Sequence, residues 1–255
     1  MLYLVAFLIE SIDPSNVDII LSESSNRGIP TISSYSDRER LYGDGANATI
    51  KGNFKRSVSY PNRYLGMLGD SPYLAEEAKY ASCQPSVDNN NKVGFEIEYK
   101  GEKDFYYPES VMGLYFDKLK QNWKRAGYET KDVVVTVPDY FSAHERKAMI
   151  EALTIADLNC TSLINESSAI ALNYGMFRRG QFDDTKPRIV GFVDIGHASG
   201  CVFFASFTKN HQKVISVTSE RFCGAREFDY LIMEQMSNLF KQKYGSNPMN
   251  NPKCR

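Results

Sequence analysis

Residues 190–204 of this 255-residue chain are VGFVDIGHASGCVFF, and this stretch decides the fold. It predicts a hydrophobic strand that ends at Asp194, a tight turn of mostly small residues, and a second hydrophobic strand. Small turn residues let the main chain come close to a phosphate and surround it with backbone N–H groups. The aspartate at the strand end is placed to hold a magnesium ion through its water shell. An ordinary β-hairpin has the same pattern, however, and the chain contains no G-x-x-x-x-G-K-[ST] motif of the Walker type.

The composition sets modest limits on function. The 30 Lys and Arg residues oppose 31 Asp and Glu residues, and the net charge of −1 predicts neither a nucleic-acid partner nor binding to a membrane surface. The cysteines are odd in number, widely spaced and without a Cys-x-x-Cys pair, which favours reduced thiols in an intracellular protein. They are Cys83, Cys160, Cys201, Cys223 and Cys254. The apolar run Leu2–Ile9 lacks a basic flank and is too short to span a bilayer, so we expect a buried strand there.

The remaining pattern predicts alternating strands and helices. Further strands are expected at Val17–Leu21, Phe95–Tyr99, Asp132–Pro138, Thr161–Ile164, Arg188–Asp194, Cys201–Phe207 and Val214–Thr218. Helices are expected from Pro108 to about Arg125, after a capping box at Ser142–Glu145, from Asn165 to Tyr174 with Gly175 closing it, and from Ala225 to Tyr244 with Gly245 as its C-cap. Hairpins followed by strand–helix units argue for an α/β fold with mixed sheets.

Four segments carry a family resemblance: Val135–Phe141, Leu163–Gly175, Val193–His197 and Cys223–Asp229. They closely resemble the ATPase domain of DnaK-type chaperones, and His197, which stands where ordinary members have glycine, resembles the large hundred-and-ten-kilodalton heat-shock branch. The resemblance implies an actin-like ATPase fold with two lobes around a nucleotide cleft. Lobe I is expected at residues 1–180, with an outer subdomain at 38–106, and an incomplete lobe II at 186–255.

The resemblance also implies a site for ATP or ADP with Mg²⁺. The second phosphate hairpin would consist of Asp194, Gly196, His197, Ala198 and Ser199, with Asp194 on the magnesium side through water. Glu166 would help to organise the metal and the attacking water, although a glutamate in the first turn of a helix is also favoured by the helix dipole. Gly224 and Glu227 would begin the adenosine-side segment, where Ala225 replaces a glycine of the family. For His197 itself, a turn position is expected rather than a metal ligand.

Two expected catalytic features are missing. The lysine that the family places next to the γ-phosphate falls at Asn62, and an amide offers no charge to a phosphoryl oxygen. The first phosphate loop of the family carries Asp-x-Gly, but Leu2–Leu8 contains neither Asp nor Gly. The chain stops at Arg255, which resembles the entry to the outer part of lobe II. We therefore expect ATP hydrolysis to be weak or absent.

Two functional classes follow from these observations. The first is an ATP-binding chaperone component that acts as co-chaperone and nucleotide exchange factor for a DnaK-type partner, with unfolded clients bound by a C-terminal region that this chain lacks. The second is a degenerate remnant without nucleotide binding and with only an interaction or structural role. An actin-like sugar or acid kinase would need a first phosphate loop and a substrate base, and neither is visible. The expected compartment is the cytoplasm, with the endoplasmic reticulum lumen as the alternative.

Overall fold

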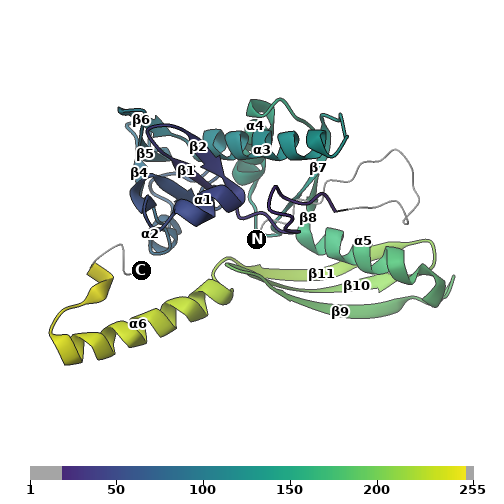
Figure 1. The fold of residues 1–255 in the computed structure, drawn as a ribbon. Coiled ribbons are helices and arrows are strands. Elements are labelled where there is room, and N and C mark those ends of the chain that lie inside the picture. Colours follow the sequence, from purple (N-terminus) through teal and green to yellow (C-terminus); the bar gives the residue numbers. More distant parts are fainter. Residues whose placement is uncertain (1–18, 251–255) are drawn as a thin grey trace. The chain divides into compact units, whose positions relative to one another are not determined.

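The computed structural model describes residues 19–250, and Figure 1 shows the order of the elements along the chain. Within this range the chain forms two compact units: residues 134–141 with 162–250 (unit 1), and residues 19–133 with 142–161 (unit 2). The predicted strand Leu2–Ile9 lies outside the described residues, and the lobe boundaries predicted at residues 180 and 186 remain predictions. None of the described helices is long and apolar enough to cross a membrane.

Unit 2 contains two antiparallel sheets, with the strand orders β2-β1-β3 and β4-β5-β6. The strands are β1 (Ile32–Tyr35), β2 (Arg40–Tyr42), β3 (Ser57–Ser59), β4 (Pro85–Val87), β5 (Val93–Tyr99) and β6 (Glu102–Tyr106). Strand β5 confirms the prediction for residues 95–99, because Phe95 and Ile97 are buried while Glu96 and Glu98 are exposed. The other strands are absent from the predictions since they are short and contain many polar residues.

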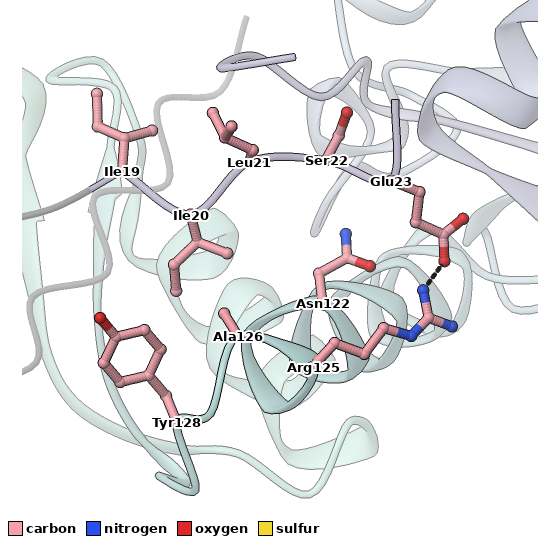
Figure 2. A pocket seen from close by; sticks show the side chains of 9 residues that line it. All are labelled: Ile19, Ile20, Leu21, Ser22, Glu23, Asn122, Arg125, Ala126 and Tyr128. Atoms are coloured by element: carbon pink, nitrogen blue, oxygen red, sulfur yellow. Dashed lines mark hydrogen bonds and ion pairs between the residues drawn. The ribbon is translucent and has the colours of Figure 1, made fainter. Parts of the chain in front are cut away.

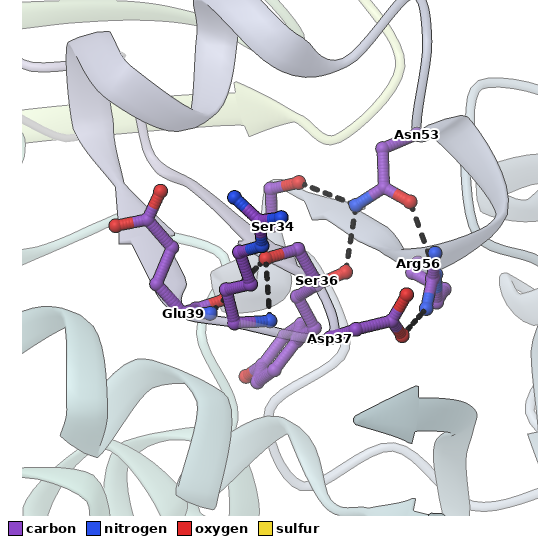
Figure 3. A network of polar contacts seen from close by, with 8 residues as sticks. Ser34, Ser36, Asp37, Glu39, Asn53 and Arg56 are labelled. Carbon is purple, nitrogen blue, oxygen red and sulfur yellow. Dashed lines mark hydrogen bonds and ion pairs between the residues drawn. The ribbon is translucent and has the colours of Figure 1, made fainter. Parts of the chain in front are cut away.

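A polar network fastens β1 to the segment that follows α1 (Gly43–Thr49), as Figure 3 shows. The Asn53 Nδ2 group donates to Ser34 Oγ at 3.0 Å and to the carbonyl oxygen of Tyr35 at 2.7 Å. The Arg56 Nε group donates to Asn53 Oδ1 at 3.1 Å, and its Nη1 atom pairs with Asp37 at 2.7 Å. Each buried polar atom of Asn53 therefore has a partner, as a buried amide requires.

The two long helices of unit 2 carry the local signals that predict them, whereas its two short helices are absent from the predictions. In chain order the helices are α1, α2 (Leu74–Ala78), α3 (Pro108–Arg125) and α4 (Ala143–Ile155). Helix α3 has Pro108 in its first turn, and α4 begins with the predicted capping box: the Glu145 N–H donates to Ser142 Oγ at 3.3 Å and the Ser142 N–H donates to Glu145 Oε2 at 2.7 Å. The two helices pack closely at Gly113, where a Cβ atom would lie 2.5 Å from Ile155 Cγ2.

The chain passes between the units along two paired strands, β7 (Asp132–Val137) and β8 (Asn159–Asn165). Strand β7 confirms the strand predicted from a continuous β-branched run, and its Val135 and Val137 side chains are fully buried. Strand β8 contains the predicted Thr161–Ile164 and extends beyond it at both ends.

Unit 1 is built on an antiparallel sheet with the order β11-β10-β9. Its strands are β9 (Arg188–Ile195), β10 (Gly200–Phe207) and β11 (Gln212–Glu220), which confirm the three predictions and extend them. One face buries Phe203, Ala205 and Phe207 in a core shared with Ala171 of α5 (Glu166–Arg178). Side chains of the other face are largely exposed; they include Ile189, Val193, Val202 and Phe204.

The prediction that α5 ends at Tyr174 with Gly175 as its cap is wrong. The helix continues to Arg178, and Gly175 lies inside it. A Cβ atom at Gly175 would lie 2.8 Å from Gln212 Oε1 and 3.3 Å from Phe207 Cε1. The glycine therefore permits a close approach of the helix to the sheet, a role that its position in the sequence does not distinguish from a C-cap.

The last long helix, α6 (Ala225–Tyr244), confirms its predicted bounds. Gly245 follows it in the left-handed conformation with φ of 75°, and its N–H donates to the carbonyl oxygen of Lys241 at 2.8 Å, as expected of a C-cap. Apolar side chains of the helix are exposed; they include Phe228, Leu231, Ile232, Met236 and Leu239.

The predicted return strand Val17–Leu21 is only partly described. Its residues Ile19–Leu21 do not form a strand, so the prediction is wrong for this part. Within residues 19–250, no strand pairs with them, and an extended segment needs a neighbouring strand to satisfy its backbone N–H and C=O groups.

Candidate functional site

The turn between β9 and β10 is fixed by hydrogen bonds to the start of α6. The Gly196 N–H donates to the Ser199 carbonyl oxygen at 2.9 Å and closes the turn. The carbonyl oxygen of Gly196 accepts from the Ala225 N–H at 3.0 Å, and that of His197 accepts from the Arg226 N–H at 2.8 Å. Two N–H groups of the helix N-terminus are thereby satisfied by the turn.

The other backbone donors of this turn are not all used. The N–H groups of Ala198 and Ser199 donate to no other group among residues 19–250. Both residues are half-buried, and both are small. Two unused donors in a tight turn of small residues are what an anion-binding main-chain site requires.

Gly224 brings the main chain before α6 against the turn. A Cβ atom at this position would lie 2.5 Å from the backbone nitrogen of Ala198 and 2.5 Å from the carbonyl oxygen of His197. The Glu227 Oε2 atom accepts from the Gly224 N–H at 2.7 Å, while its Oε1 atom accepts from Arg226 Nε at 2.8 Å. The structure thus brings the predicted Gly224 and Glu227 to the turn, where Glu227 serves as a helix cap and ion-pair partner.

His197 lies half-buried in the same turn. Burial lowers the pKa of its imidazole below the ordinary value, and the nearby Arg226 guanidinium lowers it further, against opposing effects of Glu227 and Asp229. The imidazole is therefore neutral at pH 7 and brings no positive charge to the turn.

Asp194 on β9 and Cys201 on β10 lie opposite each other in the register, one residue pair away from the end of the hairpin. The Asp194 carboxylate forms no hydrogen bond or ion pair with another residue of the described range, so its oxygens are available. Burial raises the pKa of the Cys201 thiol to about 11, and the carboxylates of Asp139, Asp194 and Glu166 raise it as well. The thiol is therefore protonated at pH 7.

Glu166 lies in the first turn of α5, as predicted, although the helix begins at Glu166 rather than at Asn165. The sequence reasoning missed Asp139, whose carboxylate accepts from the Ser167 N–H at 3.1 Å and from Ser167 Oγ at 2.6 Å. No local pattern could have found this contact, because the two residues are 28 positions apart. Across residues 19–250, no group of three or more His, Cys, Asp or Glu side chains could hold a metal ion directly.

Comparison with protein-family models matches residues 8–254 to the family described as Hsp70 protein. The chain belongs to the Hsp70 family. Its fold class is accordingly α/β with the actin-like ATPase architecture, and the small sheets and helices of both units agree with it. The three-stranded sheets are antiparallel, however, and not mixed as predicted.

Curated relatives of this Hsp70-family chain are large heat-shock proteins. Heat shock protein 88 of Dictyostelium discoideum is 32% identical over 239 residues, which cover 93% of this chain and 31% of the relative. A heat shock protein homolog of Lachancea kluyveri is 31% identical over 243 residues, covering 93% and 35%. The 97 kDa heat shock protein of Strongylocentrotus purpuratus is 30% identical over 230 residues, covering 89% and 26%. The chain thus resembles the large branch of the Hsp70 family and spans about a third or less of these relatives.

Asn62, predicted to replace the lysine of the Hsp70 family, lies in unit 2. It belongs to the short 3₁₀ helix η3 (Pro61–Arg63), and its Oδ1 atom is buried without a hydrogen-bond partner among the described residues. The neighbouring Arg63 is buried and pairs with the buried Glu77, to which its Nε group donates at 2.7 Å. The backbone before η3 is also unusual, since Tyr60 adopts the left-handed conformation with φ of 53°.

A separate cavity of about 630 Å³ lies in unit 2 and is drawn in Figure 2. Its lining combines Ile19–Glu23 with the C-terminal part of α3 and Tyr128. Glu23 forms ion pairs with Lys118, at 2.7 Å, and with Arg125, and these partners lower the pKa of its carboxyl group. No residue of the predicted nucleotide site lines this cavity.

Proposed function

We propose that this chain is the nucleotide-binding part of a chaperone of the large Hsp70 branch, and that its β9–β10 turn binds the phosphates of ADP or ATP. The observation that carries the proposal is the pair of unused N–H groups at Ala198 and Ser199, in a turn that Gly224 allows the main chain to approach. Membership of the Hsp70 family supports a nucleotide ligand, since this family resembles actin-like ATPases.

The carboxylates supply the second half of the proposed site. Asp194, which has no partner among the described residues, would hold a hydrated Mg²⁺ ion, and Glu166 would orient water at the same ion. Magnesium retains several waters in such sites and neutralises phosphate charge when bound. Gly224 and Glu227 hold the turn in place from the side of α6.

Hydrolysis of ATP is expected to be slow. The family resemblance puts Asn62 at the position of the family lysine, and its amide carries no charge to stabilise a phosphoryl transition state. Binding depends on backbone donors and a hydrated cation, so it does not need this lysine. The chain would then work as a nucleotide-dependent switch rather than as an efficient ATPase.

The proposed cellular role is exchange of nucleotide on a DnaK-type partner chaperone in the cytoplasm, with unfolded proteins as clients of the complete assembly. The similarity to relatives named as heat-shock proteins supports this role. A folded surface suffices for such docking, so a slow ATPase is compatible with it.

The test is the affinity of the purified chain for Mg·ADP, measured by isothermal titration calorimetry, in a matched pair of glycine variants. In Gly224→Ala the added methyl group meets backbone atoms at 2.5 Å and must displace the turn, whereas Gly180→Ala adds a methyl group with no atom within 4 Å. Because the turn that carries the Ala198 and Ser199 N–H groups must move, Gly224→Ala should weaken binding by about tenfold or more, whereas Gly180→Ala should bind as the parent chain does. Equal affinities of the two variants would exclude the turn as the phosphate site.

The second candidate is a remnant that binds no nucleotide, and the uncharged Asn62 at the position expected for the family lysine favours it. The same titration decides between the two. A parent chain that is folded by circular dichroism but binds neither Mg·ADP nor Mg·ATP at millimolar concentration would establish the remnant.

A further inference from the structure

Asp139 connects three segments that are far apart in the sequence. It lies in the turn that follows β7, and both of its carboxylate oxygens accept hydrogen bonds from Ser167 in the first turn of α5. A third contact is with β10, where the Cys201 thiol lies 3.9 Å from Asp139 Oδ2 as a weak donor. All these residues belong to unit 1.

The contact with Ser167 replaces a local cap of α5. Asn165, the residue before α5, occupies the N-cap position, but its side chain makes no capping hydrogen bond. Ser167 is only 1% exposed, so its hydroxyl and N–H groups depend on a protein partner, and Asp139 supplies one for each. Bonds from an N–H or O–H to an ionised carboxylate are short and strong, which fixes the first helical turn and therefore the backbone of Glu166.

The turn that carries Asp139 is itself held from another side. The guanidinium of Arg221, which is 7% exposed, lies 4.6 Å from the centre of the Tyr140 ring. Arg221 follows β11 directly and precedes α6. Asp139 is thus anchored by its neighbour as well as by its own bonds, and its carboxylate has little freedom to move.

We propose that Asp139 is a positioning residue that sets the Glu166 carboxylate relative to the Asp194 carboxylate, and thereby strengthens the binding of magnesium with nucleotide. The inference rests on the proposed function. Through Ser167, Asp139 fixes the residue next to Glu166; through Cys201, it contacts the residue opposite Asp194 in the sheet. The negative charge of Asp139 also attracts a nearby cation and repels free phosphate. The effect of Asp139 on ADP affinity therefore depends on magnesium.

The test compares ADP affinity with saturating Mg²⁺ and with EDTA for three variants. Partners that orient metal-binding groups typically contribute about 10–100-fold to metal affinity. Asp139→Ala should therefore weaken Mg·ADP binding by about tenfold or more, with little change in EDTA, and Asp139→Asn should show the same loss of magnesium dependence. The matched control is Ser142→Ala, which removes the cap of α4 in unit 2 and changes neither affinity.

Hydrogen exchange of the peptide that spans the start of α5 gives a readout without nucleotide. Asp139→Ala should accelerate exchange there, because the Ser167 N–H loses its acceptor. If exchange accelerates but Mg·ADP and ADP affinities fall equally or not at all, Asp139 is only a helix cap and the positioning role is wrong. If the parent chain binds no nucleotide, the proposed function fails and this inference fails with it.

Discussion

The family resemblance puts groups beside a phosphate in the β9–β10 turn of unit 1 and in the η3 helix of unit 2. The two segments differ in whether the expected phosphate-binding group is present. In the turn, Ala198 and Ser199 would contribute main-chain N–H groups, which a change of side chain does not remove. In η3 the expected contribution is one charged side chain, and the chain has the uncharged Asn62 at the position proposed for it.

This difference separates binding from catalysis. A backbone site tolerates sequence change as long as the main chain can follow the same path, which Gly224 ensures here. A site that stabilises a transition state depends on a particular charge at a particular place. We therefore expect a chain that binds nucleotide but hydrolyses it slowly, and the following substitutions test this expectation.

The largest effect is expected from Arg63→Leu, which breaks the scaffold beside Asn62. Removing one partner of a buried ion pair leaves the other charge uncompensated, and the cost is about 3–5 kcal/mol. Arg63 and Glu77 are 4% and 1% exposed, so this cost applies. Urea unfolding followed by the fluorescence of Trp123, the single tryptophan and a residue of unit 2, measures it.

The control for Arg63→Leu is Lys79→Ala, which removes an exposed ion pair with Glu76. Pairs of this kind contribute about 0–1 kcal/mol. Equal destabilisation by both variants would mean that the Arg63–Glu77 pair does not hold the η3 segment.

Asn62→Lys should restore part of the catalytic step. One electrostatic donor at a transition state is worth roughly 10²–10³ in turnover, so we expect a gain of about tenfold or more. Single-turnover hydrolysis of radiolabelled ATP measures the gain, with Asn62→Met as a control that matches the length without the charge. No gain over Asn62→Met would mean that the slow step has another cause than the lost lysine.

The elements with local signals could be predicted from the sequence. Helix α4 begins at Ser142 and Glu145, which cap it reciprocally, and α6 ends at a glycine with positive φ. The β1–β4 strands could not be predicted, since strands of three or four residues rely on their partners in the sheet rather than on a pattern of their own. The prediction for Gly175 was wrong because close packing and capping both demand glycine.

The candidate site likewise combines features that could be predicted from the sequence with features that could not. The turn around Gly196 and its approach by Gly224 follow from segments that the resemblance had already marked. The cap of α5 comes from Asp139, and its contact with Cys201 spans 62 positions. Contacts of this length are created by the fold, so only the structure shows them.

Two helix glycines test how rigidly each unit is packed. At Gly113, in unit 2, an added Cβ would lie 2.5 Å from Ile155 Cγ2 and 3.0 Å from the carbonyl oxygen of Ala152, so Gly113→Ala should destabilise by about 1–3 kcal/mol. At Gly175, in unit 1, the contact below 3 Å is with the flexible end of Gln212, and alanine favours the helix by about 1 kcal/mol. Gly175→Ala should therefore melt within a few degrees of the parent chain, and a loss as large as that of Gly113→Ala would contradict this.

The smallest effect is expected from Asn62→Leu, which tests whether the Asn62 amide contributes to stability or to nucleotide binding. Its Oδ1 atom is buried without a hydrogen-bond partner among residues 19–250, and such an atom carries a desolvation cost that an apolar group of similar shape avoids. Asn62→Leu should be neutral or stabilise unit 2 by up to about 1 kcal/mol in the Trp123 unfolding assay, with Mg·ADP affinity unchanged. A clear loss of affinity would instead show that the amide contacts bound nucleotide, and η3 would then have changed its contribution to the site from a charge to a hydrogen bond rather than lost it.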